Sequence, residues 1–286
     1  MRTLGGRLSI GQVGGIVAEI DDAGRRTYEL LDEELPVWVS FDLWSRLDNN
    51  FYHPAYFEAE RTLKRLADSG RMEVHSFGEL MSGDPRPGVA TCEEGSIPIL
   101  EGGNLRPNYV IPIFTKFAAT DDPLNIQGGD ILIGKDGEPG TAAAVTDELL
   151  EFIARSYERG TIASHVYRIR LREEFQSLAF YVVAYLNSRA GQAILRRYIA
   201  GGTTPTLRSG DVKAISVPVP QGGMVSVAEQ ARSNLVALQK SVLETSQHLA
   251  PSHALAEAVG LEDPSARLPI NYVGGGRSDP HGYYRK

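Results

Sequence analysis

The sequence contains one cysteine, Cys92, among 286 residues. A single thiol cannot form an internal disulfide, which excludes the class of small disulfide-stapled secreted domains and fits a reducing compartment. No apolar run reaches the roughly 18 residues that a membrane-spanning helix needs, and the N-terminus lacks the apolar core of a signal peptide. We therefore expect a soluble, cytoplasmic protein with no membrane partner.

Positive charge is also scarce. The chain has 36 Asp and Glu against 29 Lys and Arg, which gives a net charge of −7 and a pI of about 5.5. This balance argues against a protein that coats nucleic acid nonspecifically, because that function needs a basic surface. The excess acid is concentrated in residues 1–60, where eleven acidic residues stand against five Arg. The rest of the chain is close to neutral and can carry local basic surfaces.

Residues typical of metal sites and of nucleophilic catalysis are sparse as well. The six His, at positions 53, 75, 165, 248, 253 and 281, show no ligand pairing. His248 and His253 are five residues apart, but Pro251 lies between them, which does not fit a zinc-binding helix. Cys92 has no evident base partner and is interpreted as a small buried residue. We expect neither a metal site nor a catalytic residue in this chain.

Two enzyme classes were weighed on their motifs. An adenine methyltransferase needs an Asn/Asp-Pro-Pro-Tyr/Phe segment, but the nearest match, N-N-F-Y at 49–52, lacks both prolines. A metal-dependent nuclease needs converging acids with an acid-x-Lys unit. Asp211-Val-Lys213 has that local form, yet the residues before it hold few acids, and Asp211 after Ser209-Gly210 is better interpreted as part of a turn or helix cap.

The elements that the sequence does predict are mixed. A helix is expected over 54–69, beginning near Pro54 and ending at Gly70. Short apolar runs broken by Gly, Pro and Asp predict strands at 97–100, 109–114, 130–133, 142–145, 165–171 and 215–220. A short hairpin is expected through 16–20 and 26–30. We therefore predict the α/β (α+β) class, with a mixed sheet.

A helical pair is predicted over 179–198. Apolar residues recur there every three or four positions, and Ser188 interrupts the pattern where its hydroxyl can cap a second segment. Gly201-Gly202 ends that segment, and the loop G-G-T-T-P-T-L follows at 201–207. From 189 to 213 there are five Lys and Arg against one Asp. Hydroxyls, backbone amides and Arg side chains of this kind are common partners of phosphate oxygens.

A second basic stretch lies on a predicted strand. Residues 153–172 hold five Arg against one Glu. Within 165–171 the apolar residues Val166, Tyr167, Ile169 and Leu171 stand against Arg168 and Arg170, which predicts one buried face and one basic face.

The last third of the chain predicts a long helix over 226–249. Apolar residues at 227, 231, 235, 238, 242 and 249 follow a spacing close to a heptad seam. A narrow apolar stripe on a helix of roughly 35 Å needs a partner helix, which is either 54–69 or a second chain. Residues 251–286, rich in Gly, Pro, Arg and Tyr towards their end, are predicted to form a partly disordered tail.

The order of several segments is similar to that in a known family. These segments are G-S-I-P-I-L-E-G-G-N-L (95–105), G-D-I-L-I-G-K-D-G-E-P-G (129–140), S-H-V-Y-R-I-R-L (164–171), F-Y-V-V-A-Y-L-N-S-R-A-G-Q (180–192), G-G-T-T-P-T-L (201–207), I-S-V-P-V-P (215–220) and E-Q (229–230). The series resembles a target recognition domain of the specificity subunit of type I restriction–modification systems. The lead-in R-L-D-N-N-F-Y-H-P-A-Y at 46–56 resembles that family too.

The resemblance implies an α/β domain that reads DNA, joined to a long spacer helix. The usual subunit has two such domains and two helices packed antiparallel, whereas this chain has one of each and looks like a half-subunit. The implied organisation is an N-terminal appendage (1–45), a DNA target recognition domain (46–225), a dimerisation and spacer helix (226–250) and a tail (251–286). The appendage departs from the family pattern.

The resemblance also implies partners. They are double-stranded DNA, a methyltransferase subunit, a restriction and translocase subunit, and either a second copy of this chain or another half-subunit paired through 226–249. S-adenosylmethionine, Mg and ATP would be bound only by partner subunits, so this chain would be noncatalytic. Two alternatives stay open: a specificity fragment of an adenine-N6 DNA methyltransferase, and a protein-interaction module that does not bind DNA.

Ten residues are candidates for DNA contact. Asn104 follows Gly102-Gly103, and an Asn amide can bond adenine N6 and N7 together. Lys135 lies in a Gly-rich turn that can project its ammonium group towards phosphate. Turn formation by Asn104 and solvation of Lys135 are the competing interpretations. The full set is Asn104, Lys135, Arg168, Arg170, Arg196, Arg197, Thr203, Thr204, Thr206 and Arg208.

Overall fold

The computed structural model describes residues 3–4, 7–13, 16–20, 26–30, 37–41, 54–200, 204–222 and 225–258. Before residue 54 and after residue 246 it describes the backbone only. The chain divides into two compact units, Met1–Ser246 and Gln247–Lys286. Residues 259–286 of the predicted tail lie outside the described residues, whereas its first residues, 251–258, are helical and the prediction of a tail there is wrong.

The N-terminal strands form an antiparallel sheet in chain order. They are β1 (Thr3–Leu4), β2 (Arg7–Val13), β3 (Ile16–Ile20), β4 (Arg26–Leu30) and β5 (Val37–Phe41). The predicted hairpin of 16–20 and 26–30 is confirmed, because β3 pairs with β4 from Ile16↔Leu30 to Ile20↔Arg26. The segment predicted as an appendage therefore contains a five-stranded meander.

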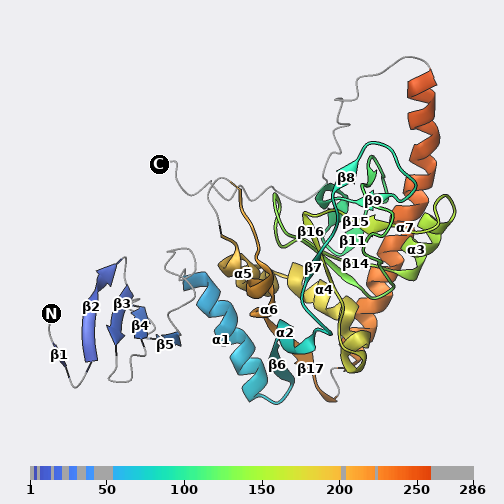
Figure 1. Cartoon of the computed structure of the whole chain (residues 1–286). Helices are drawn as coiled ribbons and strands as arrows, with labels where there is room; N and C mark the ends of the chain where they lie inside the picture. Colours follow the sequence, from blue (N-terminus) through green and yellow to red (C-terminus); the bar gives the residue numbers. More distant parts are fainter. Residues whose placement is uncertain are drawn as a thin grey trace. The chain divides into compact units, whose positions relative to one another are not determined.

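A central sheet organises the main part of the chain (Figure 1). Its strand order is β14-β13-β16-β7, and all pairs are antiparallel. The strands are β7 (Arg86–Pro87), β13 (Ile131–Gly134), β14 (Ala142–Ala144) and β16 (Val166–Ile169). The strands expected at 130–133, 142–145 and 165–171 are thus confirmed, with bounds that differ by one or two residues, and β7 was not expected.

The central sheet separates two apolar clusters. Alternate residues of each strand point to opposite faces, so Ile131 and Ile169 lie in one cluster while Leu132 and Val166 lie in the other. All four side chains are fully or almost fully buried. The helix α4 (Ala179–Asn187) contributes to the first cluster and covers that face of the sheet. The sheet is therefore covered by a buried cluster on each face, and its edge strand β7 is exposed.

Beside the first cluster, β6 (Met72–Ser76) pairs with β17 (Ser216–Pro220) in an antiparallel ladder of five residue pairs. The helix α1 (Pro54–Asp68) begins at Pro54 as predicted, and Gly70 follows its end with φ of +70°, a conformation that favours glycine. The strand at 215–220 and the helix at 54–69 are both confirmed.

Smaller elements complete the chain between residues 77 and 213. The strand pairs are β8 (Thr91–Cys92) with β12 (Phe117–Ala118), β9 (Ile99–Leu100) with β15 (Thr161–Ile162), and β10 (Leu105–Arg106) with β11 (Tyr109–Val110). The helices and 3-10 turns are α2 (Phe77–Leu80), η2 (Gly102–Asn104), α3 (Asp147–Ala154), η3 (Glu173–Leu178) and α6 (Ser209–Lys213).

The helical pair divides where the sequence indicates. Helix α4 (Ala179–Asn187) ends at Ser188, and the Ser188 hydroxyl accepts a hydrogen bond from the backbone N–H of Gly191 at the start of α5 (Arg189–Tyr198). A Cβ on Gly191 would lie 2.0 Å from the Tyr185 carbonyl oxygen, so only glycine lets the two helices meet this closely. The predicted capping role of Ser188 is confirmed.

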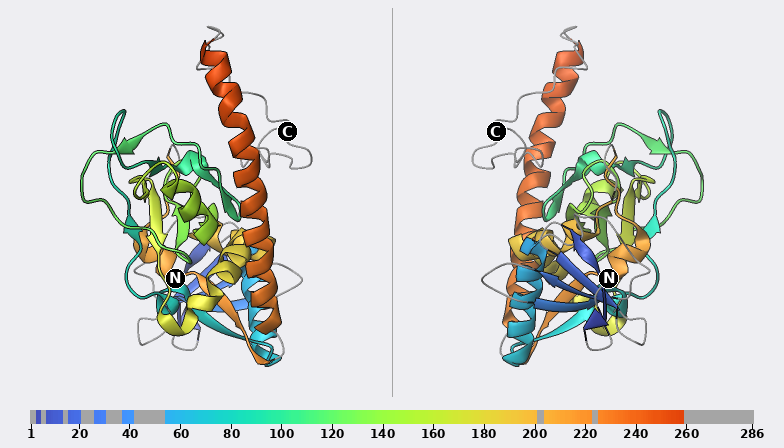
Figure 2. Two further views of the ribbon diagram at one scale, coloured as in Figure 1. Left: turned by 90° about the vertical axis from the view of Figure 1, so that its right-hand side faces the viewer. Right: turned by 90° about the vertical axis from the view of Figure 1, so that its left-hand side faces the viewer.

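The long helix α7 (Val225–Ala258) is longer than predicted and continues through Pro251. Up to Ser246 it packs on the domain by Ala228, Leu235 and Leu243 (Figure 2). The predicted apolar stripe is therefore divided, because Leu235 is buried within the chain while Val227 and Leu238 are each 39% exposed. Among the described residues, no helix has the length and apolar character needed to cross a membrane.

Gln239 fixes how α7 lies on the domain. Its side chain is fully buried, its Oε1 accepts from the Val110 N–H at 2.9 Å, and its Nε2 donates to the Val110 carbonyl at 2.9 Å. The Gln239 side-chain amide thus forms with the β11 backbone the two hydrogen bonds that a neighbouring strand would form. Lys240 adds an ion pair with Glu148 of α3 at 3.3 Å.

Candidate nucleic-acid interface

The turn after β13 is tied to the loop that precedes α6. The backbone N–H of Lys135 donates to the His165 carbonyl at 2.8 Å, and the Leu207 N–H donates to the Lys135 carbonyl at 2.9 Å. The Thr206 hydroxyl donates to Asp136 Oδ1 at 2.6 Å. Gly137, with φ of +81°, lets the chain reverse here. We call Lys135, Asp136, His165 and Thr206 the turn cluster.

Asp136 is the centre of the turn cluster. Its Oδ2 lies 3.3 Å from His165 Nδ1 and 3.4 Å from Lys135 Nζ. Burial acts to raise the pKa of this carboxyl, but the hydrogen bonds from Thr206 and His165 and the charge of Lys135 outweigh it and hold the pKa below its usual value. The carboxylate is therefore ionised at neutral pH and holds the turn, the His165 strand end and the Thr206 loop together.

Lys135 retains a partly exposed ammonium group. Its side chain is 30% exposed, and Nζ lies 6.0 Å from the centre of the Tyr167 ring, at the outer limit of a cation–π contact. Burial raises the pKa of the Tyr167 hydroxyl, so this ring stays neutral beside the lysine. A cation supported by an aromatic face on one side and open to solvent on the other can approach a phosphate.

The predicted loop residues are partly brought to the same place. Thr206 is a member of the turn cluster, Thr204 is exposed two residues before it, and Arg208 is exposed at the cap position of α6. Backbone bonds between Ala200 and Thr206, at 2.9 and 2.7 Å, close the loop that contains these threonines. Thr203 lies outside the described residues.

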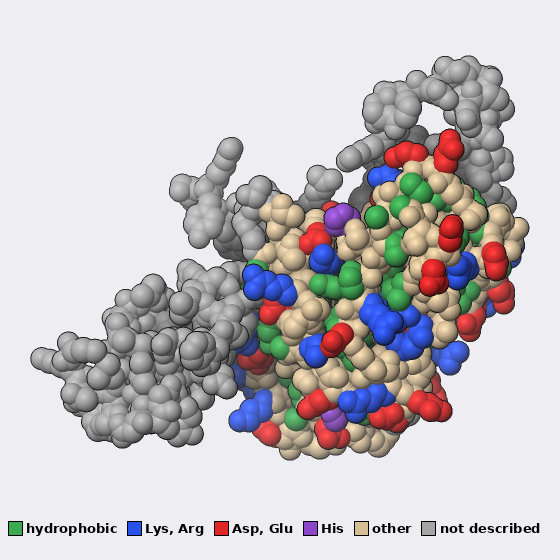
Figure 3. All heavy atoms as spheres, in the orientation of Figure 1, with side chains coloured by type: hydrophobic (Ala, Val, Ile, Leu, Met, Phe, Trp, Pro, Cys, Tyr) green, Lys and Arg blue, Asp and Glu red, His purple; other side chains and the backbone are tan. Residues whose placement is uncertain are grey.

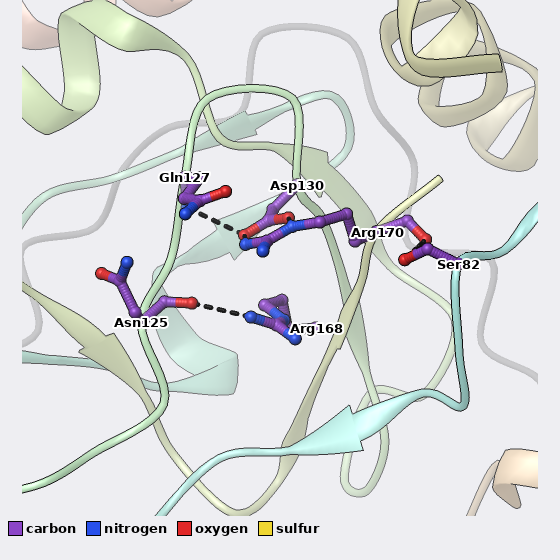
Figure 4. A network of polar contacts seen from close by, with 6 residues as sticks. All are labelled: Ser82, Asn125, Gln127, Asp130, Arg168 and Arg170. Carbon is purple, nitrogen blue, oxygen red and sulfur yellow. Dashed lines mark hydrogen bonds and ion pairs between the residues drawn. The ribbon is translucent and has the colours of Figure 1, made fainter. Parts of the chain in front are cut away.

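Arg168 of β16 and Arg170, which directly follows that strand, have different surroundings (Figure 4). Arg170 Nε and one terminal nitrogen donate to the two oxygens of Asp130, at 2.7 and 2.8 Å. Asp130 is fully buried, and its Oδ2 also accepts from the Gln127 N–H at 2.8 Å. This pair engages two of the three guanidinium nitrogens of Arg170, and the hydrogen bonds that Arg170 donates to Asp130 raise the pKa of Arg170.

Arg168 has no such carboxylate. One terminal nitrogen donates to the Asn125 carbonyl at 2.8 Å, and its buried Nε has no hydrogen-bond partner among the described residues. Burial lowers the pKa of this guanidinium, and the charges of Arg170 and Arg86 lower it further against the opposing attraction of Asp130. We call Arg86, Arg168 and Arg170 the arginine cluster.

Asn104 is used inside the fold. Its side chain is 8% exposed; Oδ1 accepts from the Glu101 N–H at 2.7 Å, and Nδ2 donates to the carbonyls of Ile111 and Ile113 at 2.9 and 2.6 Å. The amide thus bonds backbone on both of its sides. In this conformation it closes the turn of η2 and has no free edge for a base.

The two adjacent arginines of α5 also differ in their exposure to solvent. Arg196 is exposed, whereas Arg197 is 3% exposed and pairs with Glu60 of α1. Successive residues on a helix lie about 100° apart, so only one of two neighbours can face solvent fully. The structure therefore places Arg197 between α1 and α5 and leaves Arg196 on the surface.

Of the ten candidates, Lys135 and Thr206 belong to the turn cluster, and Thr204 and Arg208 are each two residues from Thr206 along the chain. Arg168 lies within β16 and Arg170 directly after it, and Arg196 is in the last turn of α5. Sequence reasoning missed Arg86, Asp136 and His165. Arg86 gave no usable signal, because its partner Arg168 is 82 residues away and its own context, D-P-R-P-G, is typical of a turn.

The surface of the domain carries both signs of charge. Figure 3 shows Lys and Arg side chains in several groups on one face, with Asp and Glu side chains between them. Among the described residues, no group of three or more His, Cys, Asp or Glu could hold a metal ion. Lys213, part of the acid-x-Lys unit, pairs with Asp84 at 2.9 Å, and Asp211 lies within the first turn of α6.

No protein-family model matches the chain, and no curated protein matches it. Among solved structures, it is similar to a chain from work on complex assembly and conformational transition of the type I R-M system, at 15% identity and a TM-score of 0.38, over 69% of this chain and 50% of that chain. It is similar to the HsdS subunit from Thermoanaerobacter tengcongensis at 14% identity and a TM-score of 0.35, over 68% and 49%. It is also similar to the type I restriction–modification system S subunit from M. genitalium at 15% identity and a TM-score of 0.34, over 56% and 37%.

All three come from type I restriction–modification systems. This chain spans half or less of the length of each of them.

Proposed function

We propose that the chain is a DNA-reading specificity subunit of a type I restriction–modification complex, with one target recognition domain that binds one half of a split site. The observation that carries this proposal is the turn cluster. Lys135, Thr206 and Arg208 come from segments up to 73 residues apart in the sequence. Asp136 holds Thr206, and the bond from the Leu207 N–H to the Lys135 carbonyl brings the neighbouring Arg208 to the same turn; Lys135 and Thr206 lie on motifs that carry the family resemblance.

The chemistry of the turn cluster suits DNA. Lys135, the exposed Arg208 and the hydroxyl of the exposed Thr204 can donate to phosphate and base-edge oxygens, while the Thr206 hydroxyl already donates to Asp136. They lie on a closed loop and on a strand end that is backed by two buried clusters, so their positions are set before a ligand arrives. Binding groups on such a rigid support lose little conformational entropy when they engage.

The long helix supports pairing of two half-subunits. Val227 and Leu238 of α7 are exposed three turns apart, while Gln239 and Leu243 hold the other side of the helix on its own domain. Two chains that pair through such a helix would place two recognition domains a fixed distance apart, and a twofold dimer would read a palindromic split site. Pairing with a different half-subunit would give two unlike half-sites.

In this proposal the chain itself is noncatalytic. A methyltransferase subunit would bind S-adenosylmethionine, and a restriction subunit would use Mg and ATP. The role of the chain is to hold those subunits at a chosen DNA sequence.

The test is co-expression of the full chain with a type I methyltransferase subunit from the same genome, followed by mapping of N6-methyladenine in the host DNA. We expect a split motif that is methylated only when both chains are present. A double variant, Lys135→Ala with Arg208→Ala, should abolish methylation at that motif, whereas Arg155→Ala, on an exposed arginine outside the turn cluster, should leave it unchanged.

Two outcomes would contradict the proposal. Methylation that does not depend on this chain would remove the reading role. Purified chain that binds duplex DNA with no dependence on sequence or on salt would do the same, because phosphate contacts make nucleic-acid affinity fall steeply with salt.

A further inference from the structure

Two arginines lie directly opposite each other at the edge of the central sheet. Arg86 in β7 is the Cα partner of Arg168 in β16. Directly opposed side chains of an antiparallel pair have Cβ atoms about 4.5–5.5 Å apart, and like charges in that position destabilise the pair. Two guanidinium groups in this position are therefore unfavourable for the fold. Unfavourable placements of this kind are expected at functional sites.

The acids near this pair are already engaged. Asp130 gives both oxygens to Arg170, and Asp84, two residues before Arg86, pairs with Lys213 at 2.9 Å. Among the described residues, neither Arg86 nor Arg168 forms an ion pair. The arginine cluster therefore carries three positive charges against one buried carboxylate, and the excess lies on Arg86 and Arg168.

The short strand that carries Arg86 is held on both sides. Before it, the Ser82 N–H and hydroxyl both donate to the Arg170 carbonyl, at 2.9 and 3.1 Å (Figure 4). After it, the Gly88 N–H donates to the Val166 carbonyl at 3.1 Å. Arg168 is held by its bond to the Asn125 carbonyl. The backbone of both arginines is thus held in place by hydrogen bonds, while the Arg86 side chain remains exposed.

We propose that Arg86 and Arg168 together bind an oxyanion of a phosphodiester, the backbone phosphate of DNA. Guanidinium groups match the geometry of phosphate oxygens, and a bound anion would relieve the repulsion between the two arginines. Arg170 is a positioning residue, because its donors are held by Asp130. The identification of DNA as the source of the phosphate rests on the proposed function, whereas the anion site itself does not depend on that function.

The first experiment measures duplex DNA binding by the full chain at a series of KCl concentrations, using fluorescence anisotropy. We expect Arg86→Ala to reduce the slope of log affinity against log salt by about 1, as the loss of one phosphate contact predicts. The affinity should fall by the same factor for target and unrelated sequences, because phosphate contacts do not read bases.

The matched control is Arg155→Ala. Arg155 is exposed at the end of α3 and contacts the Phe152 ring rather than the arginine cluster. Its replacement should leave the salt slope unchanged. The thermal midpoint of Arg86→Ala should be equal to or above that of the unmodified chain, since a like-charge contact is removed. An unchanged salt slope in Arg86→Ala would overturn the site.

The second experiment separates this site from the proposed function. Inorganic phosphate is titrated into the full chain while the arginine Nε–H signals are followed by NMR. We expect the Arg168 signal to shift, and the shift to be lost in Arg86→Ala. A shift without any DNA binding would keep the anion site and overturn the DNA-reading function; no shift of Arg168 beyond that of Arg155 would overturn the anion site.

Discussion

Two aspartates bracket β13 and have opposite surroundings. Asp130 lies just before the strand, is fully buried and is bound by Arg170, whereas Asp136 lies just after it, with a side chain that is 19% exposed. Asp130 joins a strand to a loop inside the domain. Asp136 joins two surface loops that carry the proposed DNA contacts. The same residue type thus supports the fold at one end of the strand and the site at the other, and burial decides which.

The largest expected effect is on Arg170. Replacement by Met keeps the apolar stem but leaves the buried Asp130 carboxylate without its cation, and breaking a buried pair in this way costs about 3–5 kcal/mol. Urea unfolding would measure the loss. Arg168→Met is the matched control, since Arg168 bonds only a backbone carbonyl, and should cost less than about 2 kcal/mol. Equal losses for the two variants would remove the distinction between the two arginines.

The second prediction concerns Asp136→Ala. It removes the acceptor of the Thr206 hydroxyl and should destabilise the domain by only about 1–2 kcal/mol. DNA affinity should fall about tenfold or more, equivalent to at least about 1.4 kcal/mol, because the loop of Thr204 and Thr206 is no longer fixed. Anisotropy and urea unfolding together measure the two effects. A variant that unfolds easily yet binds DNA with unchanged affinity would mean that Asp136 supports the fold and not the site.

The third prediction is a pH dependence. Because the folded-state pKa of Asp136 is lowered from 3.8, its contacts stabilise the domain fully above that pH and are lost as the pH falls through the lower folded value. The difference in stability between the unmodified chain and Asp136→Asn should be constant from pH 7 down to about 5 and shrink below about 4. Thermal unfolding of both proteins over pH 3–7 measures it. A difference that grows on acidification would contradict the sign.

The smallest expected effect on the fold is that of Lys135→Met. The partly exposed pair with Asp136 contributes about 0–1 kcal/mol to stability. The salt slope of DNA binding should nevertheless fall by about 1. A stability loss comparable to that of Arg170→Met would mean that the turn cluster is structural.

Local patterns predicted much of the fold. The division of the helical pair at Ser188, the start of α1 at Pro54 and the strands around 131 and 166 all follow from caps, Gly and apolar periodicity. The same apolar periodicity indicates a buried position for Arg197, because this residue lies three residues after the buried Ile194. Only its charge argued for the surface, and the Glu60 partner on α1 was too distant in sequence to be seen.

The site was harder to predict because its key contacts are long-range. Asp136 meets Thr206 across 70 residues and Arg86 meets Arg168 across 82, and neither pair has a local signature. Asn104 shows the reverse case: the turn interpretation was available from Gly102-Gly103, and all three of its amide bonds are within nine residues. Contacts between residues close in sequence could be predicted, whereas contacts between distant segments could not.

The Gln239 contact limits where the length of α7 can vary. One residue inserted between Val225 and Gln239 would turn the amide by about 100° and advance it by about 1.5 Å, away from the Val110 backbone. One residue inserted after Leu243 would leave that contact in place. Changes of helix length that keep the Gln239 contact are therefore confined to the part beyond Leu243. Under the proposed function, such changes would alter the spacing between two recognition domains and leave the turn cluster as it is.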